Sequence, residues 1–109
     1  MKKSESPVIS VDNERFVISN NGVSARSVLW GELEGVVAFK RDLVTTDLIC
    51  FEVTFTAADT RISIELNEEM PGFDDFVAHL AATKGYQTDW REKVLRPAFK
   101  TNPTIVFKH

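Results

Sequence analysis

Alternation of apolar and polar residues predicts β-strands over the first two thirds of the chain. The clearest case is residues 48–56 (LICFEVTFT), where every second residue from Ile49 to Phe55 is large and apolar. A period of two, rich in aromatic and β-branched residues, is typical of a strand with one buried face. Residues 61–66 repeat this pattern after a short turn, which predicts an antiparallel hairpin.

Shorter segments of the same kind are expected to extend the sheet. In the segment 33–40 we expect Leu33, Val37 and Phe39 to share one face. The first two strands are separated by three polar residues and are expected to form a hairpin, and the run Asn20-Asn21-Gly22 predicts the next turn. The additional expected strands cover residues 8–11, 15–19, 24–30, 33–40 and 104–108.

The hydrophobic period then changes from two to about 3.6 residues, which predicts a helix over residues 73–84. Its apolar positions recur three and four residues apart and form one stripe along the helix. Asp74 and Asp75 lie in the first turn, where the helix dipole favours negative charge. Gly85 follows the last turn, as is common after a helix C-terminus.

The spacing of Asp89 and Glu92 is that of a capping box and predicts a short second helix over residues 90–95. Strands followed by helices, without alternation of the two, are typical of an α+β fold with an antiparallel sheet. We therefore expect one α+β domain over residues 7–109, with six to seven strands, preceded by a disordered stretch at residues 1–6.

The composition is that of an ordinary globular protein, with 109 residues, of which 43% are hydrophobic and 27% charged. No apolar run approaches the roughly 20 residues of a membrane-spanning helix. Polar residues at positions 4–6 interrupt the place where a secretory signal has its apolar core. We therefore expect a cytoplasmic protein without a membrane span. The single cysteine, Cys50, excludes an internal disulfide.

Charge is distributed unevenly along the chain. The net charge of −3 argues against general nucleic-acid binding, which needs a basic surface. Residues 42–83 carry nine carboxylates and one arginine, whereas residues 84–109 have a net charge of +4. The acidic middle either faces the basic tail across the fold or presents an acidic surface to a basic partner. The candidate residues of that surface are Asp42, Asp47, Glu68, Glu69, Asp74 and Asp75.

Motifs for catalysis or metal binding are absent from the sequence. It contains no G-x-S-x-G, no glycine-rich phosphate loop and no H-E-x-x-H. We therefore expect no catalytic residue, metal ion or cofactor. His79 follows Asp75 by four residues, so the two are expected to pair on the helix surface. Cys50 has no basic neighbour in the sequence and is expected to behave as a small buried hydrophobe.

Lys40 and Arg41 end one predicted strand, and two interpretations of them remain open. They either contact an anion, such as a phospholipid headgroup, or form ion pairs with nearby carboxylates that hold the following connection in place. Trp30 and Trp90 are expected to be partly buried in the core, whereas an exposed tryptophan would be a good interface anchor.

A glycine turn at Gly22-Val23 is followed by a tryptophan and an acidic-aliphatic step in the stretch Trp30-Gly31-Glu32-Leu33-Glu34-Gly35-Val36. With the strands and helix around them, residues 8–84 resemble the bacterial pleckstrin-homology-like domains. The resemblance implies a partly open antiparallel barrel with a helix across one end. Residues 39–50 and 68–73 resemble small bacterial proteins, some of them from toxin-immunity loci. The chain departs from the family pattern after the helix, and it lacks the dense basic pocket of phosphoinositide-binding members.

These features together favour a non-enzymatic protein-binding module. In its most specific form it is an immunity protein that neutralises a basic toxin domain through the acidic surface. One alternative is a pleckstrin-like sensor of an anionic ligand or lipid headgroup that uses Lys40 and Arg41, and another is a small enzyme of unrecognised type. The edge strands of an antiparallel sheet also allow a homodimer.

Overall fold

Two antiparallel sheets and two helices make up the computed structural model, which describes residues 7–20, 23–42, 46–95 and 103–109. The first sheet has the order β1-β2-β3, and the second has the order β6-β5-β4-β7. In chain order the elements are β1 (Val8–Val11), β2 (Arg15–Asn20), β3 (Val23–Leu29), the 3-10 turn η1 (Trp30–Glu32), β4 (Leu33–Asp42), β5 (Asp47–Ala57), β6 (Thr60–Asn67), α1 (Phe73–Ala81), α2 (Trp90–Leu95) and β7 (Thr104–Lys108).

The α+β class and the two expected hairpins are confirmed. β1 pairs antiparallel with β2, with Ile9 opposite Ile18, and β5 pairs antiparallel with β6, with Phe51 opposite Leu66. The two sheets do not join into a closed barrel, because no described strand pairs across them. The disorder expected at residues 1–6 lies outside the described residues. Of the turn expected at residues 20–22, Asn20 is the last residue of β2 and the other two residues are not described.

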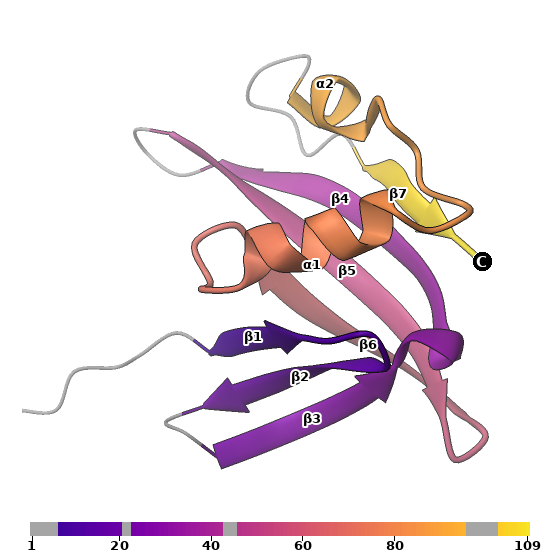
Figure 1. The fold of residues 1–109 in the computed structure, drawn as a ribbon. Coiled ribbons are helices and arrows are strands. Elements are labelled where there is room, and N and C mark those ends of the chain that lie inside the picture. Colours follow the sequence, from indigo (N-terminus) through magenta and orange to yellow (C-terminus); the bar gives the residue numbers. More distant parts are fainter. Residues whose placement is uncertain (1–6, 21–22, 43–45, 96–102) are drawn as a thin grey trace, which may run out of the picture.

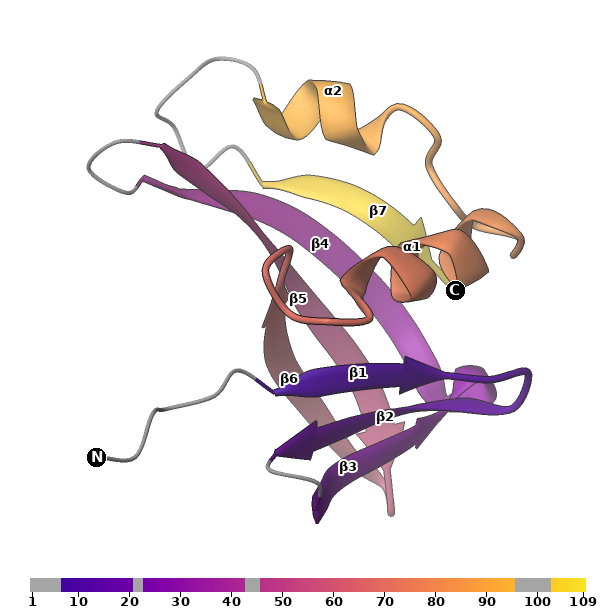
Figure 2. The same ribbon diagram turned by 60° about the vertical axis from the view of Figure 1, so that its left-hand side comes forward.

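The three-stranded sheet crosses one face of the long strands of the four-stranded sheet (Figure 1). α1 lies along β1 and fills one side of the space between the sheets (Figure 2). α2 packs on β4 and β7 at the far end of the four-stranded sheet (Figure 2). The apolar stripe of α1 and the inner faces of both sheets therefore meet in one core.

Aromatic rings form the centre of this core. The ring of Phe51 on β5 lies 4.6 Å from that of Phe73 on α1 and 5.1 Å from that of Trp90 on α2. Phe16 on β2 meets Phe76 on α1 edge to face, with 4.9 Å between ring centroids. All five side chains are buried, so both helices and both sheets are held by the same cluster.

β4 buries the opposite face from the one predicted over its middle. Val36 and Lys40 are buried, whereas Val37 and Phe39 lie on the outer face and are only half-buried. A register shift after Leu33, which is itself buried as expected, reverses the alternation for the rest of the strand. The face prediction for this strand was therefore wrong beyond Leu33.

The helix boundaries are close to the expected ones. α2 coincides with the predicted residues 90–95, whereas α1 ends at Ala81, three residues before the predicted end. The hydroxyl of Thr83 donates to the carbonyl oxygen of Leu80 at 2.6 Å, which satisfies an acceptor of the last helical turn. Gly85 then adopts a φ of 100°, a conformation that suits a residue without a side chain.

Candidate functional site: an acidic corner on an anchored turn

Four of the six predicted acidic residues lie together on the turn from β6 into α1. Glu68 and Glu69 precede the helix, and Asp74 and Asp75 occupy its first turn. All four are exposed, and none of them forms an ion pair within the part of the chain that the structure describes. We call these four residues the acidic corner.

The turn that carries the acidic corner is anchored on two sides. The backbone N–H of Ile9 on β1 donates to the carbonyl oxygen of Pro71 at 2.8 Å. The backbone N–H of Glu68 donates to the carbonyl oxygen of Ile49 at 3.0 Å, and the N–H of Ile49 donates to the Glu68 carboxylate at 2.8 Å. Gly72 has a φ of 91° and lies so close to β1 that a Cβ would clash with the Ile9 carbonyl. The backbone of the corner is therefore fixed relative to both sheets.

The electrostatics of the corner follow from this placement. Asp74 and Asp75 lie where the partial positive charge of the helix N-terminus favours carboxylates. Glu69 stays exposed while its backbone N–H donates to the Asn67 side chain at 2.9 Å. The result is an anchored turn that carries four exposed carboxylates, and such a concentration of negative charge attracts a positively charged molecule.

Of the other two predicted acidic residues, only Asp47 has a side chain that the structure describes. Asp47 begins β5 and its side chain is only 17% exposed. Its carboxylate lies 3.4 Å from the ammonium group of Lys40. Asp42 ends β4, and its side chain lies outside the described residues. Asp47 is therefore part of an inward-facing ion pair and not of an exposed acidic surface.

Lys40 and Arg41 point to opposite faces of the four-stranded sheet. Lys40 is 1% exposed, and its ammonium group donates to the carbonyl oxygen of Leu95 at 3.0 Å as well as pairing with Asp47. Arg41 lies on the outer face, where its guanidinium donates two hydrogen bonds to the Glu65 carboxylate, at 3.0 and 2.6 Å. The two cations therefore point away from each other. Lys40 pairs with Asp47, as the ion-pair interpretation expected, whereas the carboxylate that binds Arg41 comes from β6 and was not predicted.

Cys50 lies beneath the Arg41–Glu65 pair on the outer face of β5. Its side chain is completely buried, as predicted for a structural cysteine. Burial raises the pKa of the Cys50 thiol to about 11, and the nearby carboxylate of Glu65 adds to this effect. The thiol therefore stays protonated near neutral pH, which does not favour a nucleophilic role.

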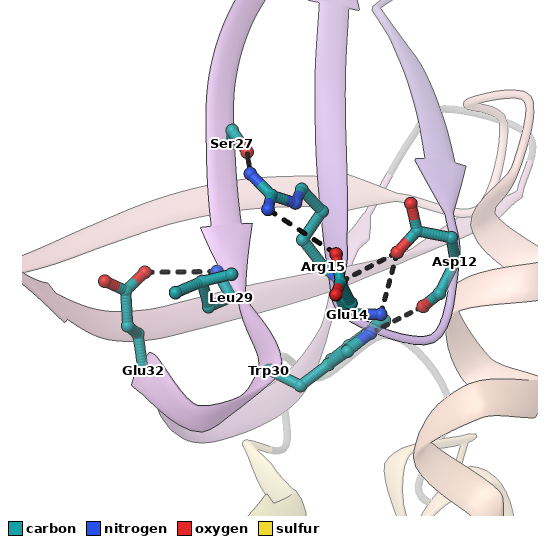
Figure 3. Close-up of polar contacts among 7 residues, drawn as sticks. All are labelled: Asp12, Glu14, Arg15, Ser27, Leu29, Trp30 and Glu32. Atoms are coloured by element: carbon teal, nitrogen blue, oxygen red, sulfur yellow. Dashed lines mark hydrogen bonds and ion pairs between the residues drawn. The ribbon is translucent and has the colours of Figure 1, made fainter.

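His79 does not pair with Asp75 but stacks on Trp30. The two rings are nearly parallel, with 3.8 Å between centroids. The expected pair does not form, because η1 brings the half-buried indole of Trp30 against the face of α1 that carries His79. The indole N–H of Trp30 donates to the carbonyl oxygen of Asp12 at 2.7 Å (Figure 3). Through the stack and this hydrogen bond, the Trp30 side chain links α1 to the β1–β2 hairpin.

The carboxylate of Asp12 closes the β1–β2 turn, next to the Trp30 side chain. It accepts hydrogen bonds from the backbone N–H groups of Glu14 at 2.8 Å and Arg15 at 2.9 Å (Figure 3). These two bonds hold the pKa of Asp12 below its ordinary value. The Asp12 carboxylate and carbonyl therefore both accept hydrogen bonds from within the chain, which accounts for the tight turn.

An open groove of about 880 Å³ lies between α2 and β7 and was not found from the sequence. Glu92 and Lys93 line the side of α2, and Ile105 and Lys108 line the side of β7. Ile105 is 49% exposed there. The groove could not be read from local patterns, because its two sides come from segments that meet only in the folded chain.

No family model, curated protein or solved structure matches this chain. Within the described ranges, no three histidine, cysteine, aspartate or glutamate side chains gather as metal ligands would. None of the helices described here is long and apolar enough to span a membrane.

Proposed function

We propose that this chain is a non-enzymatic protein-binding module that recognises a basic partner through the acidic corner. The observation that carries the proposal is the exposure of four carboxylates, without ion pairs among the described residues, on a turn anchored to both sheets. Because the backbone of the turn is already fixed, little conformational freedom is lost on binding, so less of the binding free energy is offset by ordering the site. In its most specific form, the partner is a basic toxin domain that this chain neutralises.

The acidic corner can be tested by neutralising it without changing its shape. The variant E68Q/E69Q/D74N/D75N removes four charges, and the new amide at position 68 keeps an acceptor for the Ile49 N–H. A matched control, E14Q/E52Q/D59N/E92Q, removes four charges from exposed carboxylates elsewhere. Both variants therefore have the same net charge. Thermal unfolding checks that each variant remains folded.

A partner is first identified by stoichiometric capture from lysate of the source organism at moderate salt. Association rates with that purified partner are then measured for the parent and both variants. We expect about a tenfold lower association rate for the corner variant, a smaller effect for the control, and convergence of all three at high salt. Equal rates for the two variants would contradict the proposed site. If the partner is a toxin domain, co-expression with the parent restores growth and co-expression with the corner variant does not.

A further inference from the structure

Two sheet edges of this molecule are covered by its own backbone. The edge of β1 is met by the turn before α1, where the N–H of Ile9 donates to the carbonyl oxygen of Pro71 at 2.8 Å. The edge of β7 is met by residues 85–87, which form backbone hydrogen bonds with Val106 at 2.8 Å and Lys108 at 3.2 Å. Covered edges cannot accept a further strand, so β3 and β6 are the edge strands of the described sheets that can still pair.

β6 is the longer and more regular of the two remaining edges. It pairs with β5 from Thr60 to Asn67 without a register shift, and it forms the margin of the four-stranded sheet opposite β7 (Figure 1). β5 is the only strand that pairs with it among the described elements. β3 is irregular, because its register shifts opposite Ile18 and Ser19. Its central residue, Arg26, would also face its own copy in a symmetric pair.

The sequence of β6 is complementary to itself in an antiparallel pair. When two copies are centred on Ser63, Arg61 of each lies opposite Glu65 of the other. In the same register, Ile62 lies opposite Ile64 on the inner face of the sheet. Moving the centre to either isoleucine preserves the faces but places Arg61 or Glu65 opposite a serine. The opposite charges therefore select the register centred on Ser63.

Contacts within one chain extend this complementarity. The guanidinium of Arg61 lies 3.1 Å from the Glu34 carboxylate, and Glu65 is held by Arg41. We call the junction between the two β6 strands the seam. Across the seam, the charges would alternate in sign, from Glu34 and Arg61 of one copy to Glu65 and Arg41 of the second. Ile62 and Ile64 are only half-buried in one chain, so a second copy would cover apolar surface on the other face of the same seam.

We propose that two copies of this chain pair antiparallel through β6, with Ser63 on the two-fold axis, to join their four-stranded sheets into one. Such a pair is isologous and closes on itself, so it does not propagate into fibres. A seam one strand wide is small for a protein interface, so the dimer dissociates on dilution. The seam is independent of the acidic corner.

Charge reversal with complementation tests the pairing. R61E places a carboxylate opposite Glu65 of the second copy at both ends of the seam, and E65R places two arginines together. Each variant alone is expected to raise the dimer dissociation constant about tenfold, because two cross-strand attractions become repulsions. An equimolar mixture restores opposite charges at both contacts and is expected to dimerise as the parent does. Sedimentation equilibrium follows the mass between 12.3 kDa and twice that value.

An engineered disulfide tests the register. S63C places two thiols directly across the axis, at a separation that a disulfide can bridge. S27C is the matched control, since Ser27 is an exposed serine on the other open edge strand. Cys50 is buried and does not compete. In a thiol-disulfide buffer, we expect a covalent dimer for S63C and little for S27C, together with circular dichroism spectra like that of the parent.

Three outcomes would overturn the proposal. The first is a parent protein that remains at 12.3 kDa up to millimolar concentration. The second is a mixture of R61E and E65R that dimerises no better than either variant alone. The third is equal cross-linking of S63C and S27C. None of these outcomes bears on the acidic corner, because its variants leave β6 unchanged.

Discussion

Replacing Lys40 with methionine tests whether the one charged side chain in the described core stabilises the fold. Its ammonium group lies 3.0 Å from the Leu95 carbonyl oxygen and 3.4 Å from the Asp47 carboxylate, and the side chain is 1% exposed. Methionine keeps the unbranched apolar stem and removes the charge. The carboxylate of Asp47 and the carbonyl of Leu95 then lose a charged partner at the junction of α2 with the sheet.

The magnitude follows from the distance and the burial. At 3.4 Å and an effective dielectric constant of about 20, the Coulomb attraction is about 5 kcal/mol. The cost of removing both charges from water offsets much of this, but breaking a buried pair still costs about 3 kcal/mol. We expect K40M to lower the free energy of unfolding by about that amount. For a chain of this length, the melting temperature falls by roughly 12 °C.

A double-mutant cycle separates the ion pair from the loss of packing. D47N alone leaves the buried ammonium without its carboxylate, whereas K40M/D47N removes both charges. We expect the double variant to be more stable than the sum of the single effects implies, with a coupling energy of about 2 kcal/mol. Urea unfolding followed by tryptophan fluorescence and far-UV circular dichroism gives each free energy of unfolding.

A matched exposed pair on α2 provides the control. The ammonium group of Lys93 lies 3.2 Å from the Asp89 carboxylate, and both side chains are more than half exposed. We therefore expect K93M to lower the free energy of unfolding by less than about 1 kcal/mol. If K40M costs no more than K93M, or if K40M and D47N are simply additive, the reasoning about the buried pair is refuted.

Three further predictions concern the turn before α1 and the outer face of the sheet. G72A should destabilise the fold by more than about 3 kcal/mol in urea unfolding, because it combines a φ of 91° with a clash against Ile9, whereas G31A, where a Cβ meets open space, should not. The Cys50 thiol, with its pKa raised to about 11 by burial, should react with a disulfide reagent at pH 8 far more slowly in the native state than in urea, and equal rates would contradict its burial. Hydrogen bonding from Arg41 lowers the pKa of Glu65 below 4.5, so the Arg41–Glu65 pair stabilises the fold above that pH, and this contribution is lost as the pH falls through the folded-state pKa. The difference in unfolding free energy between the parent and E65Q, less than about 1 kcal/mol, should therefore disappear in acid. A difference that grows in acid would contradict the assigned sign.

Elements with a clean local pattern could be predicted from the sequence. The alternation from Ile49 to Phe55 placed one face of β5 in the core, since side chains of a strand point to alternate sides wherever the strand lies. The stripe of α1 was predicted for the same reason, with a helical period. The exposure of Asp74 and Asp75 followed from position alone, because a carboxylate in a first helical turn remains outside when the apolar stripe faces inward.

The β4 strand shows what local pattern cannot decide. It is apolar on both faces, and a register shift after Leu33 determines which face is buried. The local pattern alone therefore could not show that Val37 lies on the outer face and that Lys40 is buried. The pairing of β4 with β5 decides both. The stacking of His79 on Trp30 could not be predicted for a related reason. Trp30 is distant from His79 in the sequence, and the two rings meet only because the two sheets cross in the folded chain.

Charge was the least predictable property at the level of single residues. The sequence counts Asp47 with the other carboxylates of the acidic middle, but the β4–β5 hairpin turns it toward Lys40. Whether a charged side chain faces water or a partner depends on contacts between segments distant in the chain, and such contacts exist only in the folded molecule. The sequence therefore determined the strands, the helices and the exposure of the first helical turn, whereas the tertiary structure decided the anchoring of the acidic corner, the buried face of β4 and the pairing of its charges.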